Sequence, residues 1–154
     1  MSKKLSYKGK LPIGEQERIK LSTIDGKTGY RIIDFRIIPG RPGVDSGEYI
    51  GQIFKRDQTG SITSVIDFTN SDLVAMSMFK THANNVYANS ESVIFDNEKF
   101  NQDIYIYISD VGGRTEPANY YIELESMELS ELETTMLTLK NLRTIASQWV
   151  NNII

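Results

Sequence analysis

The stretch NQDIYIYISDVGGRTEPANYYIELE, residues 101–125, holds four of the eight tyrosines of the chain and alternates two of them with isoleucine. Successive side chains of a β-strand point to opposite faces, so the isoleucines share one face and Tyr105 and Tyr107 share the other. After the Gly-Gly loop, residues 120–125 repeat the pattern and place Tyr121 on the face with the glutamates. We predict that these two strands pair as a hairpin and bury their isoleucine faces in a core.

Further short strands with turn signals between them are predicted before this stretch. Residues 17–38 give two apolar runs around an Asp-Gly-Lys-Thr-Gly turn and predict one hairpin. Residues 48–69 predict a second hairpin, which turns at residues 57–60, and residues 71–80 fit a strand about as well as a short helix. Seven or eight such strands favour a mainly β fold, either an antiparallel β-sandwich or a jelly-roll-like domain.

The run at residues 30–38 is apolar on both faces, which predicts an interior strand that is covered on both sides. The segment that follows, residues 39–47, has two prolines and three glycines and predicts a surface loop. By simple alternation the two faces of the strand are formed by Ile33, Phe35 and Ile37 and by Ile32 and Ile38.

The two ends of the chain differ from the central domain, residues 15–129. Residues 1–14 are rich in lysine and contain two glycines and a proline, so we predict an extended N-terminal arm. Ser130 and Glu133 form a capping box that starts a helix over residues 130–150, which packs on the domain or extends from it. Apolar residues spaced three and four apart give this helix one broad apolar side, made of Leu132, Met136, Leu139, Leu142, Ala146 and Trp149.

Composition restricts the class of protein. A chain of 154 residues corresponds to about one domain, and the absence of cysteine excludes disulfides and thiolate chemistry. The lysine-rich start has no apolar run behind it, and no segment approaches the roughly 18 apolar residues of a membrane span. We therefore expect a soluble protein that is made inside a cell and needs neither metal nor cofactor.

Charge is divided unevenly along the chain. Residues 1–56 carry 12 Lys and Arg against 6 Asp and Glu, or +6, whereas residues 57–154 carry 5 against 14, or −9. Such a division can attract two unlike partners or a head-to-tail copy. Alternatively, the two charges cancel because they lie on interleaved strands of one domain.

The sequence lacks the residue patterns of common catalytic sites. Its single histidine, His82, has no Gly-x-Ser-x-Gly partner motif and cannot form a multi-histidine zinc site. The Gly-Lys-Thr at residues 26–28 has Leu21 where a phosphate-binding loop needs glycine, and a strand follows it instead of a helix. The carboxylate pairs at residues 96–98 and 123–125 have the spacing of an ordinary turn and an ordinary strand face. We predict no catalytic residues.

The tyrosine face allows three interpretations. Nucleic acid is disfavoured, because Arg114 is the only base in residues 101–125 against five carboxylates. Sugars remain an alternative, since aromatic platforms and carboxylate acceptors suit them. We expect the C-terminal helix to cover the face, with another protein subunit as the second choice and a sugar as the third.

Residues 99–143, which include KFNQDIYIYISD and NYYIELESMELSELETTMLTLKNLR, resemble small accessory virion proteins of tailed bacteriophages. In such proteins a strand-rich domain precedes a Thr/Leu-rich run that ends in Lys-Asn-Leu-Arg. The resemblance implies a structural protein that acts by binding, often as a symmetric multimer, and that is located in the virion after synthesis in the host cytoplasm.

The combined prediction is a non-enzymatic virion protein, preferably a capsid decoration or cement protein, with a neck or tail adaptor as the next choice. Its partners would be other virion proteins and further copies of itself, without nucleic acid or membrane. The alternative is a carbohydrate-binding or adhesin-like module that uses Tyr105, Tyr107 and Tyr121. The predicted interface residues are Lys3, Lys4, Tyr7, Lys8, Lys10, Arg41, Tyr105, Tyr107, Tyr121 and Trp149.

Overall fold

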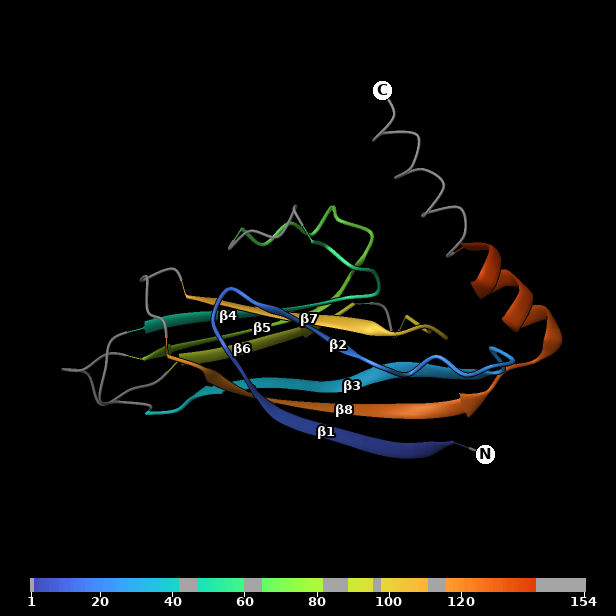
Figure 1. Ribbon diagram of the computed structural model, residues 1–154, viewed down its shortest axis with the longest axis horizontal. Coiled ribbons are helices and arrows are strands. Elements are labelled where there is room, and N and C mark those ends of the chain that lie inside the picture. Colours follow the sequence, from blue (N-terminus) through green and yellow to red (C-terminus); the bar gives the residue numbers. More distant parts are fainter. Residues whose placement is uncertain are drawn as a thin grey trace, which may run out of the picture.

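Two antiparallel β-sheets are stacked face to face in the computed structural model, which describes residues 2–41, 47–59, 65–81, 89–95, 98–110 and 116–140 (Figure 1). The three-stranded sheet has the order β1-β8-β3, with β1 Lys3–Leu11, β8 Ala118–Glu128 and β3 Thr28–Pro39. The five-stranded sheet has the order β2-β7-β4-β5-β6, with β2 Gln16–Ile19, β7 Ile104–Asp110, β4 Gly47–Phe54, β5 Leu73–Thr81 and β6 Asn89–Ile94.

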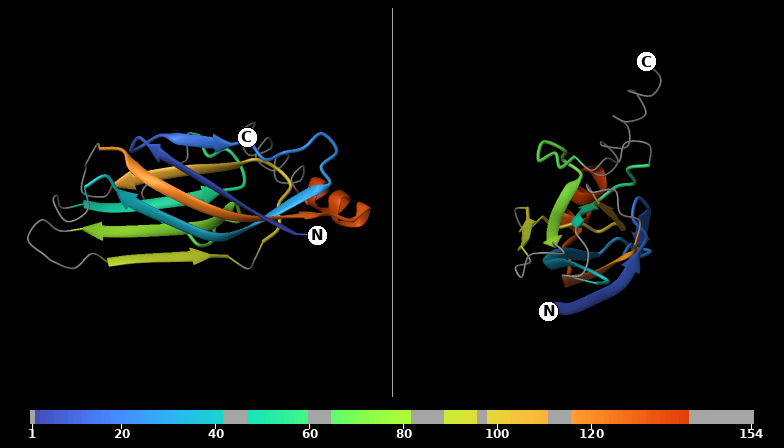
Figure 2. Two further views of the ribbon diagram at one scale, coloured as in Figure 1. Left: turned by 90° about the horizontal axis from the view of Figure 1, so that it is seen from below. Right: turned by 90° about the vertical axis from the view of Figure 1, so that its left-hand side faces the viewer.

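The connectivity follows a jelly-roll pattern. The first four strands alternate between the two sheets, and β7 and β8, which close the domain, are inserted between earlier strands (Figure 2). A regular eight-stranded jelly roll would place β6 beside β3. Here β6 pairs with β5 instead, from Ala75↔Ile94 to Lys80↔Asn89. The predicted mainly β sandwich is thus confirmed, as is the C-terminal helix over its described residues.

The isoleucine face of β7 forms the centre of the core. Ile104, Ile106 and Ile108 are fully buried, and they are covered from the opposite sheet by apolar residues of β3 and β8 such as Ile122. The sheets approach so closely that a Cβ at Gly51 would collide with Ile37. Alternation along β7 and β8 therefore predicted the buried face correctly.

The hairpins predicted from the sequence are wrong in their pairing. β2 and β3 lie in different sheets, and so do β7 and β8. β4 pairs with β5, at residues 73–81, and the described residues 65–67 of the expected return arm lie outside any strand. Residues 71–80, left open between helix and strand, contain most of β5. The physical reason is that alternation marks a strand but does not specify its partner, and a jelly roll sends consecutive strands across the sandwich.

β3 also departs from the prediction of an interior strand. It is the end strand of its sheet and contains a β-bulge between Ile32 and Asp34. The extra residue shifts the alternation by one, so Ile32 faces the core with Phe35, while Ile33 is exposed. Ile38 is exposed as well, so the apolar outer side of this strand is not covered by the described part of the chain.

The predicted N-terminal arm is a strand. β1 pairs with β8 along its whole length, from Lys3↔Ser126 to Leu11↔Ala118. Leu5, Tyr7 and Leu11 point inward and pack on the core. Intervening lysines concealed this alternation in the sequence, because their charge favoured an extended solvated segment.

The C-terminal helix is described for residues 131–140 and begins at the predicted capping box. The backbone N–H of Glu133 donates to Ser130 Oγ at 3.1 Å, and the backbone N–H of Ser130 donates to Glu133 Oε1 at 3.4 Å. The helix leaves the end of the sandwich, as Figure 1 shows, and does not cover the tyrosines of β7. The expectation that it covers Tyr105 and Tyr107 is therefore wrong for its described residues, because its contacts lie at the end of the sandwich. No described helix has the length and apolar character of a membrane span.

Candidate functional site

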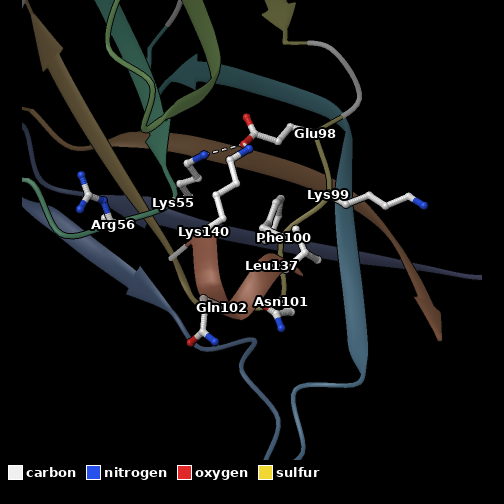
Figure 3. Close-up of a pocket in the computed structure, with 9 residues that line it drawn as sticks. All are labelled: Lys55, Arg56, Glu98, Lys99, Phe100, Asn101, Gln102, Leu137 and Lys140. Atoms are coloured by element: carbon white, nitrogen blue, oxygen red, sulfur yellow. Dashed lines mark hydrogen bonds and ion pairs between the residues drawn. The ribbon is translucent and has the colours of Figure 1, made fainter. Parts of the chain in front are cut away.

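The best-defined polar site lies where the helix meets the end of the sandwich. The segment after β4, the segment before β7 and the helix meet there, and they line a partly open cavity of about 30 Å³ (Figure 3). A cavity of this size holds about one or two water molecules, so a sugar ring or a nucleotide does not fit inside it. The lining residues are Lys55, Arg56, Glu98, Lys99, Phe100, Asn101, Gln102, Leu137 and Lys140.

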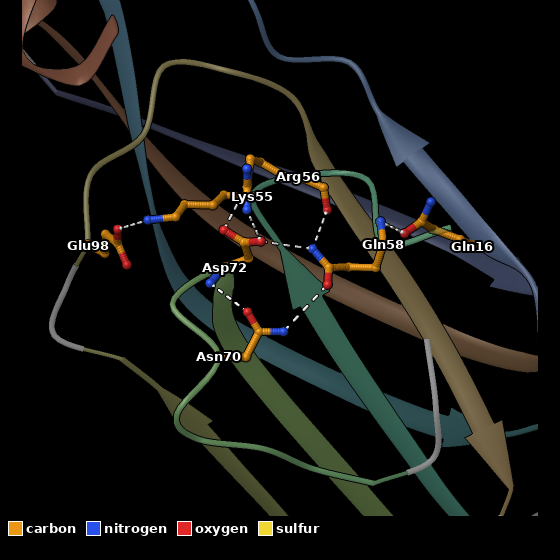
Figure 4. A network of polar contacts seen from close by, with 7 residues as sticks. All are labelled: Gln16, Lys55, Arg56, Gln58, Asn70, Asp72 and Glu98. Atoms are coloured by element: carbon orange, nitrogen blue, oxygen red, sulfur yellow. Dashed lines mark hydrogen bonds and ion pairs between the residues drawn. The ribbon is translucent and has the colours of Figure 1, made fainter. Parts of the chain in front are cut away.

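A buried ion pair fixes one wall of this site. Arg56 donates to Asp72 through Nε at 2.9 Å and through Nη2 at 2.5 Å, and the side chains are only 11% and 5% exposed. Gln58 Nε2 donates to Asp72 Oδ2 at 3.1 Å, and Asn70 Oδ1 accepts from the backbone N–H of Asp72 at 2.9 Å (Figure 4). A bidentate ion pair supported by amide side chains is rigid. This network therefore holds the start of the β4–β5 connection, just after β4, against its end, just before β5.

One donor of this network points away from Asp72. Nη1 of Arg56 is buried and has no hydrogen-bond partner among the described residues. An unsatisfied buried donor costs about 1–3 kcal/mol. The position suits a water molecule or a small anion that would accept this hydrogen bond.

Two lysine ion pairs tie the helix to the sandwich, and a third lysine of the sandwich shares the acceptor of one of them. Glu98 Oε1 accepts from Lys55 Nζ at 2.5 Å and from Lys140 Nζ at 3.2 Å. Lys99 Nζ lies 3.2 Å from Glu133 Oε2, and this contact, with the capping N–H of Ser130, lowers the pKa of Glu133. Exposed pairs of this kind contribute at most about 1 kcal/mol each.

A second hollow lies along the open edge of β3. It is a groove of about 390 Å³ between β3 and the edge formed by β5 and β6. Ser92 Oγ of β6 donates to the carbonyl of Phe35 at 2.7 Å and lies 2.9 Å from Ser77 Oγ. The groove is lined by Asp34, Arg36, Ile37, Ile38, Ser77, Phe79, Ser90, Glu91 and Ser92.

Asp103, just before β7, is the most strongly perturbed carboxyl. It accepts from the backbone N–H groups of Leu21 and Ser22, both at 2.8 Å, and forms an ion pair with Arg18. Burial alone would raise its pKa, but these donors outweigh burial and lower the pKa to about 2. The group holds the segment after β2 against β7, and its permanent charge suits a structural anchor rather than an acid catalyst.

The predicted interface residues are separated by the sandwich. Tyr105 and Tyr107 are half-buried on the outer face of the five-stranded sheet. In Figure 1 the described parts of the β4–β5 connection lie above this sheet. Burial raises the pKa of Tyr105. Tyr121 is exposed on the outer face of the other sheet, so the three tyrosines cannot form one binding face.

The basic residues of β1 gather near Tyr121. Lys8 is its register partner on β1 and Arg36 its register partner on β3. Lys4 and Lys10 are exposed on the same outer face as Lys8. Of the remaining predicted residues, Lys3 is exposed at the start of β1, Tyr7 is half-buried against the core, Arg41 is exposed after β3, and Trp149 lies outside the described residues.

Charges of the two sequence halves are interleaved on this face. The basic strands β1 and β3 flank the acidic strand β8, with Lys4 3.9 Å from Glu123 and Arg31 paired with Glu125 at 2.5 Å. Of the two readings of the charge division, the structure favours cancellation within one domain. The Arg56–Asp72 network was not predicted from the sequence, where its only signal is the cluster of Asp, Asn and Gln in loops after an apolar run.

Metal binding and known relatives give no further assignment. Within the described ranges, no group of three or more His, Asp or Glu side chains is arranged to hold a metal ion. Neither protein-family models nor curated protein sequences match this chain. The function must therefore be argued from the fold and the surfaces above.

Proposed function

We propose that this protein is a non-enzymatic structural subunit of a bacteriophage particle that acts by binding neighbouring subunits. The observation that carries the proposal is the jelly-roll order of the strands, an architecture that viral capsid domains use repeatedly. The resemblance of residues 99–143 to accessory virion proteins supports it independently of the fold.

The chemistry of the described site is consistent with this role. Its strongest charges, Arg56 and Asp72, neutralise each other, and Glu98 is held by two lysines. The cavity beside them holds about one or two water molecules, which is too small to enclose a substrate. These groups connect segments of the chain, as expected of a rigid subunit that binds through its outer surfaces.

Within the particle we favour a decoration or cement role on the capsid surface over a neck or tail adaptor. The basic residues first assigned to an arm now lie on a fixed sheet, so contact would be made by a rigid face containing Lys8, Lys10 and Tyr121. Removing residues 2–12 would not be a clean test of binding, because it would delete β1 and the buried Leu11.

The test is to purify particles that contain this protein and measure its copy number by quantitative mass spectrometry and cryo-electron microscopy. We expect a fixed stoichiometry and an ordered position in contact with other subunits. Lys8→Glu with Lys10→Glu should reduce incorporation, whereas Lys20→Glu, an exposed lysine outside β1, should not. Absence of the chain from purified particles would overturn the proposal.

A sugar-binding module is the second candidate, because Tyr105 and Tyr107 share one half-exposed face. Tyr121 offers a matched control, since it lies on the opposite sheet. On a glycan array, signal that is lost with Tyr105→Ala or Tyr107→Ala but kept with Tyr121→Ala would favour this function. No signal with the wild-type chain would exclude it for the glycans on the array.

A further inference from the structure

The described part of the C-terminal helix has two sides with different environments. One side faces the sandwich: Glu133 and Lys140 form ion pairs with it, and Leu137 lines the cavity. On another side Leu132 is 70% exposed, Met136 61% and Leu139 51%. Because the first side is already occupied, the helix cannot turn its apolar stripe inward without breaking those contacts.

The spacing of the stripe is that of a coiled coil. Leu132, Leu139, Ala146 and Ile153 recur every seven residues. Leu142 and Trp149 follow Leu139 and Ala146 by three, and Thr135 holds the corresponding position in the first heptad, beside Met136. Six steps cover the 21 positions from 132 to 153, or 3.5 residues per step, which is the heptad value rather than the 3.6 of a single straight helix. The stripe therefore continues in sequence for 13 residues beyond the described part of the helix, as far as Ile153.

The surroundings of the stripe favour an identical partner. Thr135, which lies beside the stripe on the exposed side, is uncharged, so at this position two copies can approach without repulsion between like charges. A heptad seam is self-complementary, because equivalent positions of identical helices meet across a symmetry axis. Of the charged residues in the described helix, Glu133 and Lys140 are already paired with the sandwich, and Glu131 lies exposed in the first turn.

We propose that the C-terminal helix is a self-association element, through which a second copy of this chain packs on the stripe that contains Leu132, Met136 and Leu139. Each sandwich then projects from one end of a shared helical seam. This goes beyond the particle role proposed above and does not depend on it: a monomeric chain could still be a virion protein, and a self-associating chain could lack that role.

The test is the mass of the full-length chain in solution, measured by sedimentation equilibrium over a range from about 1 to 100 µM. We expect the wild-type chain to have at least twice the mass of one chain at the upper end of this range. The double variant Leu132→Glu/Leu139→Glu should return to the mass of one chain, because it places charges within the seam. Its fold should be unchanged by circular dichroism, since both side chains are exposed.

Two further variants keep the test decisive. Thr138→Glu adds the same charge to the same helix away from the stripe and should keep the wild-type mass. Met136→Glu should weaken association by itself. The proposal is overturned by a wild-type chain that is monomeric at 100 µM, or by association that survives in the double variant.

Discussion

The isoleucine face of β7 and the leucine stripe of the C-terminal helix are both regular apolar patterns, yet they have opposite environments. Ile104, Ile106 and Ile108 are fully buried between the two sheets, whereas Leu132 and Leu139 are mostly exposed. Apolar periodicity in the sequence thus identifies a face that must be buried, but it does not identify what buries it. For β7 the cover is the same chain, and for the helix we infer that it is another copy.

The largest expected effect on stability comes from a substitution in the buried isoleucine face of β7. Ile106→Ala removes a fully buried side chain between the sheets, so the free energy of unfolding should fall by about 2–5 kcal/mol. Urea denaturation followed by circular dichroism measures this loss. A loss below about 1 kcal/mol would mean that the core around β7 collapses to fill the space.

Asp103, which lies just before β7, should make the free energy of unfolding depend on pH. The folded pKa of Asp103 is about 2, below the ordinary value of 3.8, so its contribution of about 2 kcal/mol is present above pH 4 and is lost as the pH falls from about 4 to about 2. Denaturation curves at several pH values should show this loss. Asp103→Asn should remove it, and Glu131→Gln, an exposed change in the helix, should leave it in place.

A smaller effect is expected from a substitution that destabilises the helix without destabilising the sandwich. Ser130→Ala removes the capping oxygen that accepts from Glu133, which should destabilise the helix by about 1 kcal/mol. Amide hydrogen exchange should become faster at residues 131–134 and stay constant in β7. Ser130→Asp keeps a capping acceptor and should behave like the wild-type chain. Equal acceleration in β7 would show that helix and sandwich unfold together.

The smallest expected effect on stability comes from a substitution in the exposed leucine stripe of the C-terminal helix. In solutions dilute enough to contain single chains, Leu139→Ala should change the free energy of unfolding by less than about 0.5 kcal/mol. The same urea experiment applied to Ile106→Ala provides the contrast. A loss above about 1.5 kcal/mol would place Leu139 against its own sandwich and contradict the difference between the two faces.

Local patterns predicted the elements of this fold better than their arrangement. The alternation in β7 and β8 and the Ser130–Glu133 capping box depend on neighbours a few residues away, and the sequence displays them directly. Pairing depends on partners far along the chain, such as Lys3 with Ser126, which no local pattern contains. The bulge at Ile33 similarly reverses the faces of β3 through one residue that simple alternation does not reveal.

The candidate site was harder to predict for the same reason. Arg56 and Asp72 are 16 residues apart and become neighbours only because β4 and β5 pair. Tyr105 and Tyr121 looked like members of one face because their strands are consecutive, but the chain crosses to the other sheet between them. Residue type indicated which side chains can bind, and topology decided which of them can act together.

Because β6 pairs with β5, no described strand pairs with the free edge of β3. The two sheets are joined along this edge by side chains instead of by main-chain hydrogen bonds between strands. At Phe35 the joint is the hydroxyl of Ser92, which reaches a main-chain carbonyl of the opposite sheet. A single hydroxyl contact is weaker than a row of cooperative main-chain hydrogen bonds. The domain should therefore open locally first along this edge of β3. Mechanical or thermal stress would then separate the sheets from this side, while the β1–β8–β3 ladder keeps its register.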